Sequence, residues 1–318
     1  MLEGCNRPNW ARTQAWLLPK LINNNRLKTL IMRCDVGVMN LGRSGNNSRK
    51  LERIVKLLNV QNGEPEIVYY PSLFCQLSLP MARTNQKLFL RDSGKVAMQL
   101  STTSHLPYGT IARRVLIYIA NHISRSGIIN IPKSQASLLR ALGLGTSGAD
   151  VKRLKVQLQA FSDITLTVSR DQETVISYAP LFEQSGVRYL NGILPQLSEP
   201  AKQQIFQPLT PLNKSAVEAL IHTPFAFDLY TWLAWRAVSL KKPVTRVSWL
   251  QLHRQFASNQ NLAAFKQHFK RQLALVTLAY PAITDKVICE SEVLVLKRYQ
   301  PHVTPRPTAT KLSTASVE

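Results

Sequence analysis

The spacing of apolar residues in the middle of the chain predicts three helices followed by a two-stranded hairpin. Apolar positions recur at steps of three and four residues in the helical segments and alternate with polar positions in the strands. A charged turn at 170–173 joins the last two strands. The predicted helices cover residues 112–124, 134–142 and 150–161, and the predicted strands cover 128–131, 164–169 and 175–178.

The same order of elements is predicted a second time, from Thr223 onward. Pro107 and Pro224, which lead the two copies, are 117 residues apart. The second set has helices over 227–240, 248–256 and 262–278, and strands over 244–247, 287–289 and 293–296. Helix, strand, helix, turn, helix and hairpin is the order of a winged helix. We therefore predict an α+β, helix-rich fold with two winged-helix domains in tandem and small antiparallel hairpins.

The two copies divide the chain into five expected segments. These are an N-terminal extension, a first winged-helix-like domain, an ordered connector, a second winged-helix-like domain that binds DNA, and a disordered tail. Their expected boundaries are 1–60, 61–182, 183–222, 223–299 and 300–318. The connector is expected to carry one or two short helices, and the extension a basic loop at 40–50 and a short helix at 51–58.

The charge of the chain indicates the kind of partner that it binds. The chain carries 40 Lys and Arg against 18 Asp and Glu, a formal charge of +22. Residues 229–284 contain eight Lys and Arg and not one acid, although their aromatic content is that of a folded core. A folded unit with a surface of one sign repels itself unless a polyanion relieves the repulsion. Nucleic acid is the first candidate, and a solvated basic surface is the alternative.

The predicted third helix of each copy offers the side chains for such a contact. In the second copy, Phe265 and Phe269 predict the buried stripe, with Lys, Gln and Arg residues beside it; Arg and Gln suit the edges of guanine and adenine. In the first copy, Ser147 and Asp150 have the spacing of a capping box that starts the helix. The candidate DNA-binding residues are Arg246, Arg254, Lys266, Gln267, Lys270, Arg271, Lys152, Arg153 and Lys155.

Motifs for catalysis or metal binding are weak. Gly143, Gly145 and Gly148 form a GxGxxG sequence, but a predicted helix rather than a strand precedes it, so a turn is favoured. The four cysteines and six histidines show no metal-ligand spacing, and there is no Walker A sequence. We expect no catalytic residue, metal or cofactor. The cysteine pattern and the lack of a signal peptide or a long apolar run indicate a reduced, cytoplasmic protein.

Aromatic residues that could act in nicking or base stacking are predicted to be core residues instead. Tyr118 and Tyr230 fall on apolar helix faces, and Trp232 and Trp235 are spaced for a helix inside an apolar run. The sequence does not exclude another tyrosine as a nucleophile.

Several tracts resemble the plasmid-encoded RepA replication initiator family of bacterial plasmids. They are Leu106-Pro107-Tyr108-Gly109, Ser147-Gly148 with Arg153-Leu154-Lys155, and above all the tract from Pro224 to Arg236. The resemblance spans about residues 70–298. It implies two winged-helix-like domains, binding to the plasmid origin, and recruitment of the host replication initiator and helicase proteins. It also suggests that one domain serves mainly dimer contacts and the other DNA.

The sequence therefore predicts a replication initiator, not an enzyme, that binds double-stranded plasmid origin DNA sequence-specifically and also represses its own gene. Two alternatives stay open: a transcriptional repressor without initiator role, and a rolling-circle nicking enzyme. The second would need a Tyr nucleophile together with a metal-binding His pair. The origin sequence, the host partner and the choice between monomer and homodimer are not fixed by the sequence.

Overall fold

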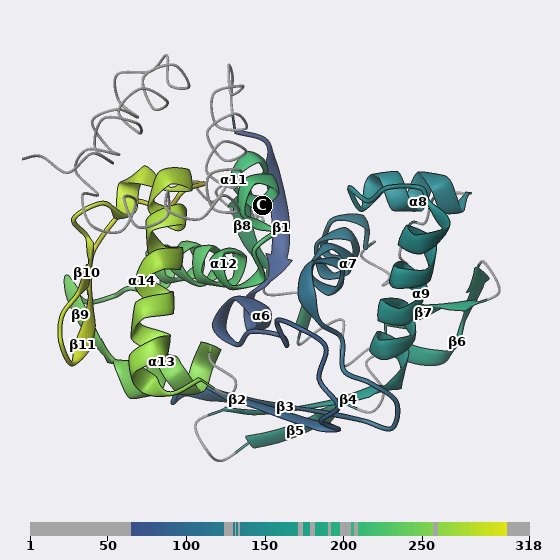
Figure 1. Ribbon diagram of the computed structural model, residues 1–318, viewed down its shortest axis with the longest axis horizontal. Coiled ribbons are helices and arrows are strands. Elements are labelled where there is room, and N and C mark those ends of the chain that lie inside the picture. Colours follow the sequence, from purple (N-terminus) through teal and green to yellow (C-terminus); the bar gives the residue numbers. More distant parts are fainter. Residues whose placement is uncertain are drawn as a thin grey trace, which may run out of the picture.

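The protein combines helices with small antiparallel sheets, as expected for an α+β chain (Figure 1). The computed structural model describes residues 65–303 apart from 124–129, 131, 133, 171–173, 179–181, 190–191, 198–204, 207–208 and 257–259. In Figure 1 the helices of the first copy lie on the right and those of the second on the left. A four-stranded sheet runs along the base beneath both.

The first copy contains the predicted three helices and hairpin. Its helices are α7 (Gly109–His122), α8 (Gln135–Ala141) and α9 (Gly148–Asp163), and its hairpin strands are β4 (Ile164–Arg170) and β5 (Thr174–Tyr178). An earlier hairpin of β2 (Leu88–Asp92) and β3 (Val96–Thr102) extends the sheet to the antiparallel order β2-β3-β4-β5. Ile164, Leu166 and Val168 are buried, so the predicted alternation is confirmed. The strand predicted at 128–131 falls almost entirely outside the described residues.

The local signals that start and end these helices are also confirmed. The Ser134 side chain accepts a hydrogen bond from the Ser137 amide at the start of α8. Gly143 has φ 63°, a left-handed conformation that suits glycine, and it ends this helix region. The Ser147 side chain accepts from the Asp150 amide at the start of α9. The GxGxxG sequence is therefore the turn between α8 and α9.

The second copy follows the predicted order with boundaries shifted by at most three residues. It comprises α12 (Pro224–Ser239), β9 (Val244–Ser248), α13 (Trp249–Phe256), α14 (Leu262–Ala279), a 3-10 turn at Pro281–Ile283, β10 (Val287–Cys289) and β11 (Val293–Lys297). The strands pair antiparallel in the order β10-β11-β9. Helix α12 is buried along most of its length, including Tyr230 and Trp232, which are core residues as predicted. Tyr118 of α7 is buried too.

The segment between the copies contains a short helix, as expected, together with strands that were not predicted. It contains the antiparallel strands β6 (Phe182–Tyr189) and β7 (Gly192–Leu197), then β8 (Leu209–Asn213) and one helix, α11 (Lys214–Leu220). Strand β8 pairs antiparallel with β1 (Ile67–Pro71), and helix α6 (Ser72–Gln76), which follows β1, packs on α12. Residues 67–76, placed by the sequence in the first domain, therefore also build the core around the second copy.

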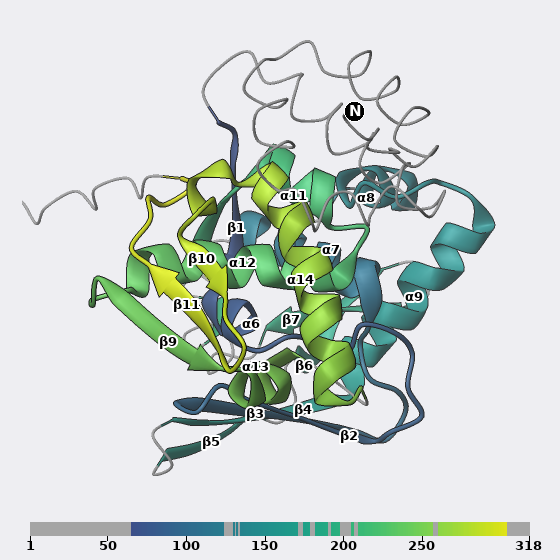
Figure 2. The ribbon, with the colours of Figure 1, turned by 60° about the vertical axis from the view of Figure 1, so that its left-hand side comes forward.

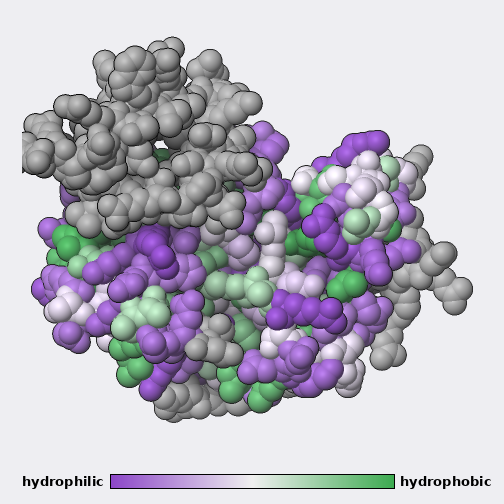
Figure 3. All heavy atoms as spheres, viewed as in Figure 1, coloured by the Kyte–Doolittle hydropathy of each residue, from purple (hydrophilic) through white to green (hydrophobic). Residues whose placement is uncertain are grey.

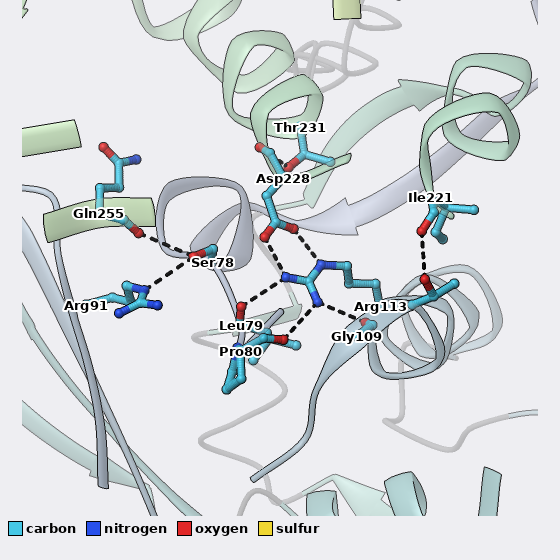
Figure 4. A network of polar contacts seen from close by, with 11 residues as sticks. Ser78, Leu79, Pro80, Arg91, Gly109, Arg113, Ile221, Asp228, Thr231 and Gln255 are labelled. Atoms are coloured by element: carbon cyan, nitrogen blue, oxygen red, sulfur yellow. Dashed lines mark hydrogen bonds and ion pairs between the residues drawn. The ribbon is translucent and has the colours of Figure 1, made fainter. Parts of the chain in front are cut away.

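A buried ion pair joins the first helices of the two copies. Arg113 of α7 and Asp228 of α12 contact through two hydrogen bonds of 2.6 and 2.5 Å, and both side chains are almost fully buried (Figure 4). The remaining Arg113 N–H groups donate to the carbonyls of Leu79, Pro80 and Gly109. Burial lowers the pKa of Arg113, but the Asp228 carboxylate raises it by more, so the guanidinium stays charged. Each partner is the fifth residue of its helix, so equivalent positions of the two copies meet here.

A second polar contact ties the base sheet to the second copy. Arg91 of β2 donates to the Ser78 hydroxyl, and Ser78 donates to the Gln255 carbonyl in α13 (Figure 4). The Gln251 side chain donates to the Ser93 carbonyl at the β2–β3 turn. Burial lowers the pKa of Arg91 to about 10. Hydrogen bonds therefore connect the base sheet to α13 of the second copy.

The first residues of the predicted disordered tail are packed in the structure. His302 stacks on Tyr280, with ring centroids 4.5 Å apart, and its Nδ1 lies 3.0 Å from the Tyr230 hydroxyl. Val303 is buried. Residues 304–318 and 1–64 lie outside the described residues, so the predictions for them stay predictions.

The packing of His302 predicts a stability that depends on pH. Burial lowers its pKa to about 4, whereas an unfolded histidine has a pKa of about 6.5. Between these values the unfolded chain binds a proton that the folded chain does not, so stability falls as the pH drops from about 6.5 to about 4. We expect a loss of about 2 kcal/mol in the free energy of unfolding over that window.

Urea unfolding at a series of pH values measures this loss, and His302→Asn, which cannot titrate, is the control. The difference in unfolding free energy between wild type and His302→Asn should shrink steadily as the pH falls through the window. A difference that is independent of pH would show that His302 titrates normally in the folded protein.

Candidate nucleic-acid interface

Helix α14 is exposed in its first half and buried in its second. It begins after Asn261, whose side-chain oxygen accepts from the Ala264 amide at 2.8 Å. Residues 273–280 are all buried, so the helix is anchored by its C-terminal half. In its first half, Phe265 and Phe269 are buried as predicted, whereas Gln267, Lys270 and Arg271 are exposed. Because residues of an α-helix are about 100° apart, these three form one face.

Aromatic packing fixes the direction of that face. The ring of Phe225, from the start of α12, lies about edge-on to Phe265 and Phe269, at centroid distances of 6.0 and 6.1 Å. Trp249 of α13 contacts Phe269 in the same manner at 5.3 Å. The His268 ring stacks on Phe225. Phe265, His268 and Phe269 lie within about 100° of one another around the helix, so the rings hold one side of α14, and the exposed Gln267, Lys270 and Arg271 lie on the opposite side. Figure 2 shows α14 beside α12 and α13.

Lys266 differs from the other candidates on α14. It is half-buried, and its ammonium donates to the Ser291 carbonyl at 2.7 Å in the turn between β10 and β11. It also lies 5.9 Å from the centroid of the Trp249 ring, within reach of a cation–π contact. The structure thus gives Lys266 a partner inside the protein, and a contact with DNA stays a prediction for this residue.

Arg246 and Arg254 are exposed on neighbouring elements of the second copy. Arg246 lies on β9, an edge strand, opposite Val295 of β11. Arg254 lies near the end of α13, which packs against α14. The structure therefore brings Arg246, Arg254, Gln267, Lys270 and Arg271 onto exposed positions of one copy. In Figure 3 the flank that carries α14 is mostly hydrophilic.

The structure adds a basic group that the sequence reasoning missed. The Arg298 amide donates to the Pro243 carbonyl at 2.9 Å, which brings the end of β11 to the turn before β9. The exposed cations gathered there are Lys241, Lys242, Lys297 and Arg298. Along the chain, Lys297 and Arg298 stand near Glu290 and Glu292, so the local charge looks balanced. In the folded hairpin the two pairs are far apart, because Glu290 and Glu292 lie at its turn and Lys297 and Arg298 lie at its open end.

The first-copy candidates lie apart from these residues. Lys152, Arg153 and Lys155 are exposed on α9, and Figure 1 places α9 and α14 on opposite flanks of the molecule. Arg153 forms an ion pair with Asp150. Hydrogen bonds from Ser147 and Arg153 hold the pKa of the Asp150 carboxyl below its usual value. Part of the positive charge of α9 is therefore already balanced within the helix.

Other chemistry-bearing residues have structural partners. The Tyr118 hydroxyl donates to the Asn130 carbonyl, and one nitrogen of His253 lies 2.6 Å from the Gln260 carbonyl. Within residues 65–303, outside the gaps given above, no group of three or more His, Cys, Asp or Glu side chains could hold a metal ion. In the same part of the chain no helix has the length and apolar content of a membrane span.

Comparisons with known proteins give only a distant structural likeness. No family model and no curated protein matches the chain. Two crystal structures of domains 2 and 3 of RctB cover 72% and 71% of the chain, and 96% of each of those chains is covered. Their TM-scores are 0.38 and 0.35, and their sequence identities are 12% and 11%. A likeness this distant assigns neither a family nor a function to the chain.

Proposed function

We propose that this chain is a plasmid replication initiator that binds double-stranded origin DNA sequence-specifically through its second copy. The observation that carries the proposal is the outward face of α14. It combines Gln267, Lys270 and Arg271 without an acid on the helix. Lys and Arg neutralise phosphates, while Arg and Gln also form paired hydrogen bonds with guanine and adenine edges.

The arrangement of the second copy supports this use of α14. Helix, strand, helix, helix and hairpin follow one another, with sheet order β10-β11-β9, and this is the order that we interpret as a winged helix. In helix-turn-helix proteins the N-terminal residues of the recognition helix contact base edges. The exposed half of α14 is its N-terminal half. We interpret the first copy as a second winged helix whose α9 contributes less to DNA binding.

The initiator role itself rests on the resemblance of the Pro224–Arg236 tract to RepA initiators. Since most of this tract is buried in α12, the resemblance concerns the core of the second copy and not its DNA contacts. We propose that the chain performs no chemistry, needs no metal or cofactor, recruits host initiator and helicase proteins, and represses its own gene from the cytoplasm. A transcriptional repressor would use the same DNA-binding surface, so DNA binding alone does not separate the two.

A replication assay separates them. The gene is supplied to a plasmid that carries the candidate origin but lacks its own initiator, and plasmid maintenance is scored. Maintenance is expected, and it should be lost with Arg271→Ala. Repression of a reporter without plasmid maintenance would favour the repressor. Cleavage of a supercoiled origin plasmid by the pure protein with divalent metal would favour the nicking enzyme.

Substitution of the adjacent residues Lys270 and Arg271 should affect DNA affinity in different ways. Arg271 has the fork geometry that suits guanine, whereas Lys270 acts as a point charge. We expect Arg271→Ala to weaken binding to the selected site by about 1–3 kcal/mol and binding to random duplex much less. Lys270→Ala should weaken both about equally and reduce the salt slope by about one unit.

The measurement is a salt titration of the full chain against two duplexes. One duplex is enriched by the wild-type protein from a random-sequence pool, and the other is its scrambled counterpart. Both substituted side chains are exposed, so folding should be unaffected, and an unfolding curve checks this. Unchanged binding of the enriched duplex by both variants would exclude α14 as the recognition helix.

A further inference from the structure

The turn between β10 and β11 carries two exposed glutamates on a firmly held backbone. Glu290 donates its amide to the Val293 carbonyl at 3.0 Å. Trp249 donates its indole N–H to the Glu290 carbonyl at 3.0 Å and its amide to the Glu292 carbonyl at 3.3 Å. Because Trp249 is itself buried, the backbone of both glutamates is held against the core of the second copy.

This turn lies against the basic half of α14. The Lys266 ammonium donates to the carbonyl of Ser291, the residue between the two glutamates. On the adjacent strand end, burial raises the pKa of the Cys289 thiol to about 11, and the charge of Lys270 opposes that rise. Lys266 of α14 thus contacts the acidic turn, and Figure 2 shows the β10–β11 hairpin beside α14.

The negative charges of Glu290 and Glu292 should lower the affinity for random DNA more than the affinity for a selected site. Binding to random sequence comes from neutralised phosphates, so a repelling charge at the edge of the interface weakens it directly. Binding to a selected site adds base contacts from Gln267 and Arg271, which project from the face of α14. A protein distinguishes two ligands by a difference of affinities, and repulsion of the wrong one is an effective way to widen it.

We propose that Glu290 and Glu292 determine specificity by repelling duplex DNA that makes only phosphate contacts with α14. The inference rests on the proposed DNA-binding function and deepens it. It assigns the hairpin turn a role opposite to that of a wing that grips the DNA backbone. The cations of this hairpin, Lys297 and Arg298, lie at its other end.

The test uses the full chain with Glu290→Gln and Glu292→Gln, singly and together. Affinity is measured at about 0.1 M salt for the duplex enriched from a random pool and for its scrambled counterpart. We expect the double variant to bind the scrambled duplex about three- to tenfold more tightly. Affinity for the enriched duplex should rise less, so the ratio of the two affinities falls.

Asp285→Asn is the matched control for each single variant. Asp285 is exposed at the opposite end of the hairpin, and its φ of 59° is one that Asn tolerates. It removes one negative charge, as each single variant does, but it should change the affinity ratio little. An equal change with Asp285→Asn would show a general charge effect and overturn the inference.

The other outcomes are equally decisive. Weaker binding of the enriched duplex by the double variant would mean that the glutamates contact bases, and unchanged binding of both duplexes would mean that they face away from DNA; either overturns the inference alone. If the wild-type chain binds no duplex in a salt-dependent manner, the proposed function fails together with it.

Discussion

Arg113→Met should lower the free energy of unfolding by about 3–5 kcal/mol. Removing the guanidinium leaves the Asp228 carboxylate buried without its partner. It also removes the hydrogen bonds from the guanidinium to the carbonyls of Leu79, Pro80 and Gly109, although Pro80 keeps the bond from the Gly109 amide. Arg113→Lys should cost less, because it keeps the charge but loses the planar fork that reaches four groups at once. Urea unfolding of the full chain measures both.

The double variant Arg113→Met with Asp228→Leu shows how much of the stability loss comes from the unpaired carboxylate of Asp228. A buried ion pair replaced by apolar side chains is often neutral, so the double variant should recover part of the stability that Arg113→Met loses. Recovery should be incomplete, since the hydrogen bonds from the guanidinium to the three carbonyls are still lost. Equal losses for the single and the double variant would show that Asp228 does not depend on Arg113.

The regular elements could be predicted closely from the sequence, because their signals are local. Helix α14 was predicted over 262–278 and spans Leu262–Ala279, with the period of Phe265 and Phe269 marking its buried side. The turn at Gly143 and the cap at Ser147 were predicted from residue type and spacing. In each case the residues that decide the conformation are within one or two helical turns of it.

Contacts between distant segments could not be predicted in this way. Strands β1 and β8 pair although about 140 residues separate them, and neither has an alternation that stands out from its surroundings. The partner of Arg113 is Asp228, which lies in the apolar tract that defines α12, 115 residues further along the chain. Only the meeting of α7 and α12 at their fifth residues makes that acid a core residue.

Only the part of the candidate interface that depends on local sequence could be predicted. Helical period alone puts Gln267, Lys270 and Arg271 on one outward face. The bond from Lys266 to Ser291 depends on the hairpin folding back on α14, which no local pattern reveals. Likewise, Glu290 and Glu292 are separated from Lys297 and Arg298, at opposite ends of the hairpin, only once β10 pairs with β11.

The largest effect on DNA binding is expected from removing three cations of the second copy together. Arg254, Lys270 and Arg271 are exposed on α13 and α14, which pack against each other. If each neutralises one phosphate, the triple alanine variant should lose up to about 2.7 units from the slope of log K against log salt. Affinity at about 0.1 M salt should fall by about a hundred- to a thousandfold.

The matched control is the triple alanine variant of Lys152, Arg153 and Lys155, which also removes three exposed cations. Its effect should be clearly smaller, because Arg153 is already paired with Asp150 and α9 lies on the opposite flank. A larger loss with this control would transfer DNA recognition to the first copy. Equal losses would indicate a duplex that contacts both copies, and the Arg113–Asp228 pair, which joins α7 to α12, would then help to set the spacing between the two contacts.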